Sequence, residues 1–195
     1  MLNNVVALLG GAAPELGDYE SIQTYTVGAG GQSTITFSSI ASTYKHLQVR
    51  AITKAVSATA GGAALFLRMN SDSGNNYSIH QLYGNGSSAA AAADSSISYA
   101  FVGNNGGYQS LTVGDGASMY SAHVIDILDY ANTSKYKTVR AIHGRDNNST
   151  TGRIMLESGL WQSTTAINSL SFTMRDGAGA SNIAQYSSFA LYGIK

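Results

Sequence analysis

The chain has 195 residues, enough for one domain with a proper core, and its 11 Lys and Arg residues balance 11 Asp and Glu residues. Zero net charge argues against a general nucleic-acid-binding protein, which carries a basic excess, and the lack of cysteine excludes disulfides, thiol chemistry and cysteine metal sites. Charged residues reach only 11%, which suits a closely fitted assembly better than a lone solvated enzyme.

Residues 1–20 are expected to form an N-terminal arm. An apolar run, VVALL, ends at a pair of glycines and is followed by the only proline of the chain. The run is too short for a membrane span and lacks the basic start of a signal peptide, so neither is expected. Two interpretations stay open: a first strand of the same domain, or an arm that buries its large apolar side chains in a neighbouring subunit. These side chains are Val5, Val6, Leu8 and Leu9.

From residue 21 onwards the pattern is that of β-strands. Apolar and polar residues alternate, rich in Thr, Val, Ile, Tyr and Phe, between clusters of Gly, Asn, Asp and Ser. The expected strands cover residues 21–27, 33–40, 46–53, 64–69, 120–128, 137–144, 153–161, 168–174 and 188–194. The only helical turn expected is at 41–45. We therefore predict an all-β fold, with residues 21–195 forming a single antiparallel β-sandwich of jelly-roll type; a barrel is the less favoured alternative.

The segment YKHLQVR, residues 44–50, has a clear inward and outward face. Its strand places Leu47, Val49 and Ala51 inward. A hydrogen-bonding face remains on the other side, either solvated or in contact with a partner, and consists of Lys45, His46, Gln48 and Arg50. The strand expected at 120–128 is apolar on both faces towards its end, which is typical of a central strand.

The segments between the expected strands are long and rich in Gly, Asn, Ser and Asp, which supply turn conformations at little cost. The expected loops are 70–76, 83–96, 103–118, 144–152 and 175–182. The second of them contains five consecutive alanines, 89–93, which we expect in an irregular surface loop rather than in a helical turn.

No motif of catalysis or metal binding is present, and we expect no catalytic residue, no metal ion and no cofactor. Residues 70–76 have the rhythm of a calcium loop but lack its terminal glutamate. Trp161 is expected to fill the core rather than to serve as a sugar platform. The histidines form no HExxH or His-x-His pattern; they are His46, His80, His123 and His143. A glycosidase carboxylate pair would have to come from Asp126, Asp129, Asp146, Glu157 and Asp176, and nothing in the sequence brings any two of them together.

Three stretches carry a resemblance to a known family. They are SIQTYTVGAGGQSTITFSSIASTYKHLQVRAI, LFLRMNSDSGNNYSIHQLYGNG and the final SFALYGIK. Together they resemble a family of small virion proteins of tailed bacteriophages. The resemblance implies a β-sandwich module of a capsid or tail, located in the virion and without catalytic activity. The chain departs from a full-length tail fibre in having no coiled-coil or collagen-like shaft.

Two functions follow from the resemblance. The first is a capsid cement or decoration protein, expected to be a homotrimer, whose partners are sister copies and the major capsid protein or another virion protein. The alternative is a tail-fibre or tail-tip module that recognises bacterial surface glycans through Tyr83 and Tyr108. A glycan is a partner only under this alternative, and neither nucleic acid nor membrane is an expected partner.

Overall fold

The computed structural model describes residues 18–56, 62–103, 118–146, 152–176 and 179–195, and every regular element in these residues is a strand. The strands are β1 (Tyr19–Thr26), β2 (Thr34–Phe37), β3 (His46–Thr53), β4 (Ala63–Met69), β5 (Tyr77–Gly84), β6 (Ala89–Ile97), β7 (Ala100–Gly103), β8 (Ser121–Leu128), β9 (Lys137–Arg145), β10 (Arg153–Trp161), β11 (Leu170–Asp176), β12 (Gly179–Ser181) and β13 (Ser188–Ile194). The predicted all-β fold is confirmed.

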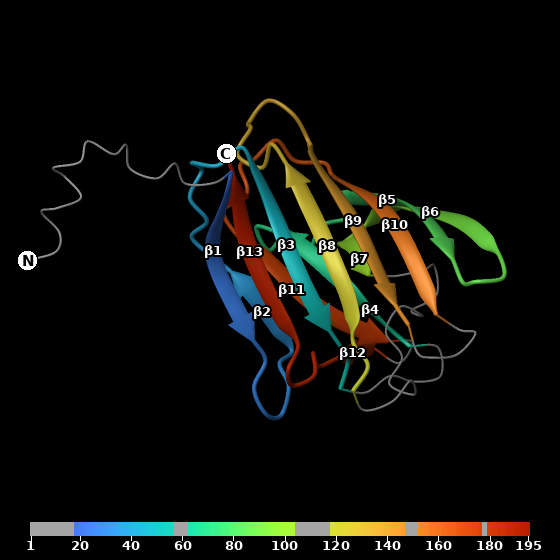
Figure 1. Ribbon diagram of the computed structural model, residues 1–195. Helices are drawn as coiled ribbons and strands as arrows, with labels where there is room; N and C mark the ends of the chain where they lie inside the picture. The colour runs from blue at the N-terminus through green and yellow to red at the C-terminus, as the bar shows by residue number, and fades with distance from the viewer. Residues whose placement is uncertain (1–17, 57–61, 104–117, 147–151, 177–178) are drawn as a thin grey trace, which may run out of the picture.

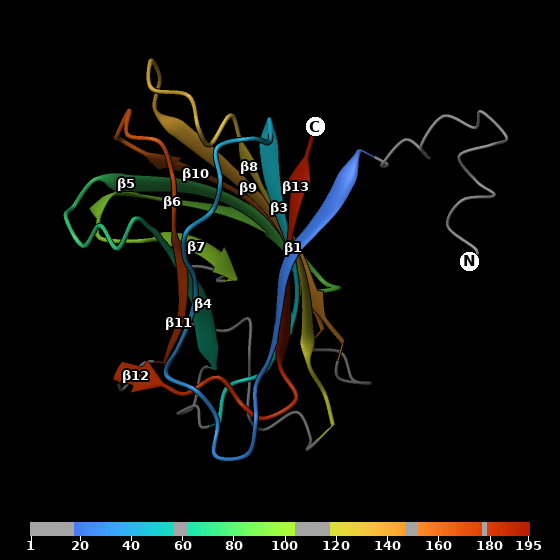
Figure 2. The ribbon, with the colours of Figure 1, turned by 90° about the vertical axis from the view of Figure 1, so that its left-hand side faces the viewer.

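The strands form two antiparallel sheets. The larger has eight strands in the order β1-β13-β3-β8-β9-β10-β5-β6, and the smaller contains β12-β11-β4-β7 with β2 paired to β11. Figures 1 and 2 show the sheets packed as layers, with the larger one curving around the smaller. The architecture is a β-sandwich, and its jelly-roll type stays a prediction.

The core lies between the sheets, where apolar side chains of both sheets meet. Phe172 of β11 packs edge-on against Phe37, with ring centroids 6.2 Å apart, and contacts Phe189 of β13 at 5.3 Å. Leu47 and Val49 are fully buried and Ala51 nearly so, as the alternation predicted. Trp161 is also buried; it stacks on Tyr77 and donates a hydrogen bond to Asp72.

Asp72 shows why residues 70–76 form a turn without calcium ligation being needed. Its carboxylate accepts hydrogen bonds from the backbone N–H of Gly74 at 2.8 Å, from Asn76 Nδ2 at 2.9 Å and from Trp161 Nε1 at 2.7 Å. Burial opposes ionisation of this carboxyl group, but the hydrogen bonds, led by that from Trp161, hold its pKa below the ordinary value. The carboxylate therefore serves as the centre of a turn.

Two segments of the family resemblance meet in space. The Tyr44 ring packs on β13 at Gly193, where an added Cβ would lie only 2.3 Å from two ring atoms. The Tyr44 hydroxyl donates to Glu20 Oε1 at 3.0 Å, and Lys195 Nζ lies 3.1 Å from Glu20 Oε2. Gly193 of SFALYGIK is thus needed to make room for the ring of Tyr44 from YKHLQVR. This ring covers one end of the sheet.

Several loop predictions were wrong. The alanine run belongs to β6, an edge strand paired with β5, with Leu82 opposite Ala91. Alanine has a low strand propensity, and here the pairing with β5 decides the conformation. Strands β5, β7 and β12 were also missed, and residues 41–45 are not helical.

Most of the expected arm lies outside the described residues, including Val5, Val6, Leu8 and Leu9. Its last two residues, Tyr19 and Glu20, begin β1 and pair with Ile194 and Gly193 of β13.

Candidate functional site

The outer face of the eight-stranded sheet, which points away from the five-stranded sheet, exposes many large apolar side chains. Their exposed fractions run from 38% to 66%, whereas most of the residues before and after them in each strand are buried. Scattered apolar residues on a protein surface need no explanation, but a contiguous group of them marks an interaction surface. The group consists of Ile52, Leu82, Val124, Leu128, Ile142, Ile154 and Leu156.

Strand register arranges most of this group in two adjacent rows, which we call the apolar rows. The first row places residues of successive strands directly opposite one another: Val124, Ile142, Leu156, Leu82 and Ala91. The second row runs beside it through Ile52, Ala122, Gly144, Ile154, Gly84 and Ala89. The residues named in the two rows are uncharged, and the first row is bounded by Arg50 of β3, which lies directly opposite Val124. At about 4.8 Å between strands, the longer row extends for about 24 Å across six strands.

Beside the apolar rows, polar side chains of the outer face are linked to one another by hydrogen bonds. Gln48 Nε2 donates to Asp126 Oδ1 at 2.8 Å, and Arg50 Nε donates to Gln48 Oε1 at 2.9 Å. Arg140 completes the network with a bond of 3.1 Å to Asp126 Oδ2. The Arg50 guanidinium also lies over the rings of Tyr19 and Tyr192, 5.7 and 5.5 Å from their centroids. These side chains are therefore held in fixed positions beside the apolar rows.

The four residues predicted as one surface do not act together. Gln48 and Arg50 join the network, although Gln48 is only 7% exposed because its neighbours cover it. His46 instead accepts a hydrogen bond at Nδ1 from the backbone N–H of Asp129 at 3.0 Å. Lys45 is exposed and lies immediately before β3. The sequence identified the correct face but did not identify its apolar half.

A second feature, a buried polar row on the inner face of the same sheet, was not predicted. Glu157 accepts a hydrogen bond from Gln81 Nε2 at 2.7 Å and lies 3.3 Å from His143 Nε2. His143 stacks on His123, with ring centroids 5.3 Å apart, and His123 Nε2 lies 2.9 Å from the Thr53 hydroxyl. The five side chains connect β5, β10, β9, β8 and β3 beneath the apolar rows.

Burial determines the charge state of His123, one member of this row. Burial first, and then the neighbouring His143, lower the pKa of His123 to about 3, although the contact with the Val102 carbonyl favours the charged form. His123 is therefore neutral at physiological pH. All five side chains are at most 4% exposed. His123 and His143 also border a second cavity, of about 620 Å³, which extends past Arg145 to the pocket end of the sheet.

The carboxylates considered for glycoside cleavage occupy different environments. Asp126 is bonded on the outer face, and Glu157 is enclosed in the buried polar row. Asp129 pairs with Lys135 in the turn after β8, and Asp146 lines a pocket at the sheet end. Nothing in this arrangement, for the residues whose side chains are described, directs two carboxylates at a common point.

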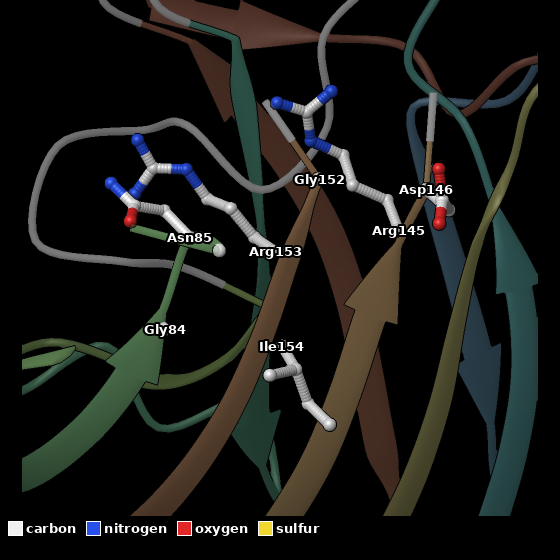
Figure 3. Close-up of a pocket in the computed structure, with 8 residues that line it drawn as sticks. Gly84, Asn85, Arg145, Asp146, Gly152, Arg153 and Ile154 are labelled. Carbon is white, nitrogen blue, oxygen red and sulfur yellow. The ribbon is translucent and has the colours of Figure 1, made fainter. Parts of the chain in front are cut away.

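That pocket lies at one end of the eight-stranded sheet, between the ends of β5 and β9 and the start of β10 (Figure 3). It measures about 340 Å³, within the range of small-ligand sites. Its described lining consists of Gly84, Asn85, Gly86, Arg145, Asp146, Gly152, Arg153 and Ile154.

Comparisons of this chain with protein-family models, with curated proteins and with solved structures found no match. In the part of the chain that the structure describes, no group of three or more His, Cys, Asp or Glu residues is arranged to hold a metal ion. Over the same residues, no helix has the length and apolar character needed to cross a membrane.

Proposed function

We propose that this chain is a structural protein of a phage virion, a cement or decoration protein that docks on the capsid shell through the outer face of its eight-stranded sheet. The observation that carries the proposal is the pair of apolar rows, which are exposed, contiguous and uncharged. Covering an apolar surface of this kind with a partner is favourable, because it removes the surface from water. The resemblance to small virion proteins supplies the identity of the partner, the major capsid protein.

The energetics favour a role in which many copies act together. Covering an apolar patch on the order of 300 Å², the scale of functional patches on protein surfaces, contributes about 7.5 kcal/mol at 25 cal/mol per Å². Association costs several kcal/mol, so the net gain per copy is modest. A cement protein present in many copies makes a modest contact effective, because every copy strengthens a boundary between shell subunits.

The polar network beside the apolar rows adds specificity to the contact. Arg50 is fixed by Gln48 and two tyrosine rings, and Arg140 by Asp126, so both guanidinium groups are presented in defined positions. Preorganised charges at the rim of an apolar contact select a partner of matching charge more than they add affinity. We expect acidic residues on the shell surface opposite them.

A homotrimer, and an arm that buries Val5, Val6, Leu8 and Leu9 in a neighbouring copy, remain part of the proposal. The glycan-binding alternative depends on Tyr83 and Tyr108. Tyr108 lies outside the described residues. Tyr83 is half-buried with the Arg153 guanidinium 5.9 Å from its ring centroid, which leaves less of the ring for a sugar, and we therefore prefer the cement role.

Placing a charge in the apolar rows should abolish docking. We expect Ile142→Lys and Leu156→Lys each to weaken attachment to shells lacking the protein by at least tenfold, because each buries an unpaired charge in an apolar contact. Attachment is measured by cosedimentation of added protein with the shells. Both positions are exposed in the free protein, so the melting temperature should change little.

Thr36→Lys is the matched control. Thr36 is exposed on β2, in the other sheet, and the substitution adds the same charge. This variant should attach like the wild type. If the two outer-face variants also attach at full strength, the outer face is not the docking surface.

A further inference from the structure

One edge of the eight-stranded sheet is open. In the strand order, β1 and β6 lie at the two ends, and among the described residues no strand pairs with the outer side of β6. Figure 1 shows the two strands at opposite margins of the larger sheet. An edge strand presents a row of backbone N–H and C=O groups with which a further strand can pair. The open side of β6 is therefore a place where another chain can bind.

The other edges of the two sheets have features that prevent such pairing. The pairing of β1 is irregular between Ser21 and Gln23, and its Glu20 forms an ion pair with Lys195. In the smaller sheet, the marginal strands β2 and β7 have four residues each and β12 has three. Bulges, charges and short strands are common means by which proteins avoid contacts between sheet edges.

β6 has none of these features along its first half. It is nine residues long, and its irregularity against β5 lies near its far end, at Tyr77 and Ser78 of β5. The run from Ala89 to Ala93 pairs regularly with β5 and contains neither proline nor a charged residue. The first charge of the strand is Asp94. Methyl side chains are too small to cover the backbone, so a second strand can approach this half of β6 closely.

We propose that two copies of this chain pair through their β6 strands, antiparallel and edge to edge, about a two-fold axis at Ala91. This register pairs all five alanines with alanines, and Ala89 then lies opposite Ala93 of the second copy. It also places Asp94 opposite Ser88 rather than opposite the second Asp94, so like charges do not meet across the axis. Such a contact is self-complementary, because the same surface serves both copies.

The apolar rows favour a second copy as the occupant of this edge. The first row ends at Ala91, which is exposed and lies directly opposite Leu82. Directly opposite residues share a face of the sheet, so the two-fold axis continues the row into the second copy. The joined row crosses five strands of each copy, about 43 Å at 4.8 Å between strands. The gain for docking rests on the proposed function, whereas the pairing itself does not.

This contact is distinct from the contacts within the proposed homotrimer, and it links a copy of one trimer to a copy of the next. Five paired residues bury little surface, so a single contact is weak. Several such contacts between oligomers act together, because each later one forms at a high effective concentration.

The test uses single cysteines, since the chain has none of its own. Ala91→Cys should form a disulfide-linked dimer on mild oxidation, seen on a non-reducing denaturing gel, because the axis brings the two copies of this residue to about 5 Å between Cα atoms. Ala89→Cys or Ala93→Cys alone should not, because each lies about 13 Å along the strand from its own symmetry mate. A mixture of these two variants should form the dimer, because the two positions face each other.

Light scattering gives a second readout. Ala91→Lys should lower the mass measured for the wild type at high protein concentration, because it places two like charges opposite each other. Thr36→Lys, which adds the same charge on β2, should leave this mass unchanged. The proposal is overturned if Ala91→Cys forms no dimer, if all three single-cysteine variants form it equally, as random collisions would produce, or if Ala91→Lys leaves the mass unchanged. Shell attachment is measured separately, so a failure of docking does not alter these results.

Discussion

Replacing Glu157 by alanine should lower the free energy of unfolding by about 3–5 kcal/mol, from a buried hydrogen-bond donor left without its acceptor and a cavity left between the sheets. Glu157 is 1% exposed and accepts the hydrogen bond of Gln81 while facing His143. The substitution removes the acceptor from Gln81, removes the partner of His143 and leaves a cavity between the sheets. Urea denaturation at pH 7 measures the loss.

Two further variants distinguish the effect of the lost hydrogen bonds on stability from the effect of the lost side-chain volume. Glu157→Gln keeps the shape and one carbonyl acceptor, so it should cost clearly less than alanine. Ser158→Ala changes the next residue, which is exposed on the outer face, and should change stability by less than about 0.5 kcal/mol. A loss below about 1 kcal/mol for Glu157→Ala would show that the buried polar row does not stabilise the sandwich.

Lowering the pH from 8 to 5 should reduce the free energy of unfolding by about 2 kcal/mol through His123 alone. Its pKa is about 3 in the folded chain against an ordinary value of 6.5. The unfolded chain therefore takes up a proton below pH 6.5 that the folded chain refuses. Stability is lost progressively as the pH falls from about 6.5 towards 3, and it is fully retained above this range.

Urea denaturation at a series of pH values tests this expectation. Carboxylates also titrate towards the lower end of the range, so the contribution of His123 is the difference in slope between wild type and His123→Gln. Between pH 6 and 5, the slope of the unfolding free energy against pH should be smaller in the variant by the amount that corresponds to about one proton taken up on unfolding. His80→Gln, at an exposed position of β5, should retain the wild-type slope. Equal slopes for wild type and His123→Gln would mean that His123 is protonated as easily in the folded chain as in the unfolded one.

The strands were largely predictable because alternation is a local property. HLQVRAIT shows its inward face without any knowledge of its neighbours, and the structure confirms that Leu47, Val49 and Ala51 are buried. On the other face Arg50 is exposed, but Gln48 is buried by neighbouring side chains. The strand formed by the alanine run was not predictable, because alanine carries no strand signal and its conformation depends on pairing with β5. Propensity fails where a non-local partner decides the structure.

The candidate surfaces depend on register, which no single strand reveals. The apolar residues on both faces of β8 predict a central strand, and β8 is the fourth of the eight strands in its sheet. The pattern does not predict that one of these apolar faces is exposed, as it is at Val124 and Leu128. Only the pairing of Val124 with Ile142, and of Ile142 with Leu156, shows that the exposed residues form a row. Likewise, alternation points His123 and His143 inward, but register alone makes them neighbours.

The central claim is that this chain is a building block of the virion, present in many copies on the shell. The most direct measurement is its copy number per particle, by quantitative mass spectrometry of purified virions with the major capsid protein as internal standard. We predict hundreds of copies per particle, in a simple ratio to the capsid protein. A few copies to a few dozen would indicate a tail component, and absence from the purified particle would contradict the account.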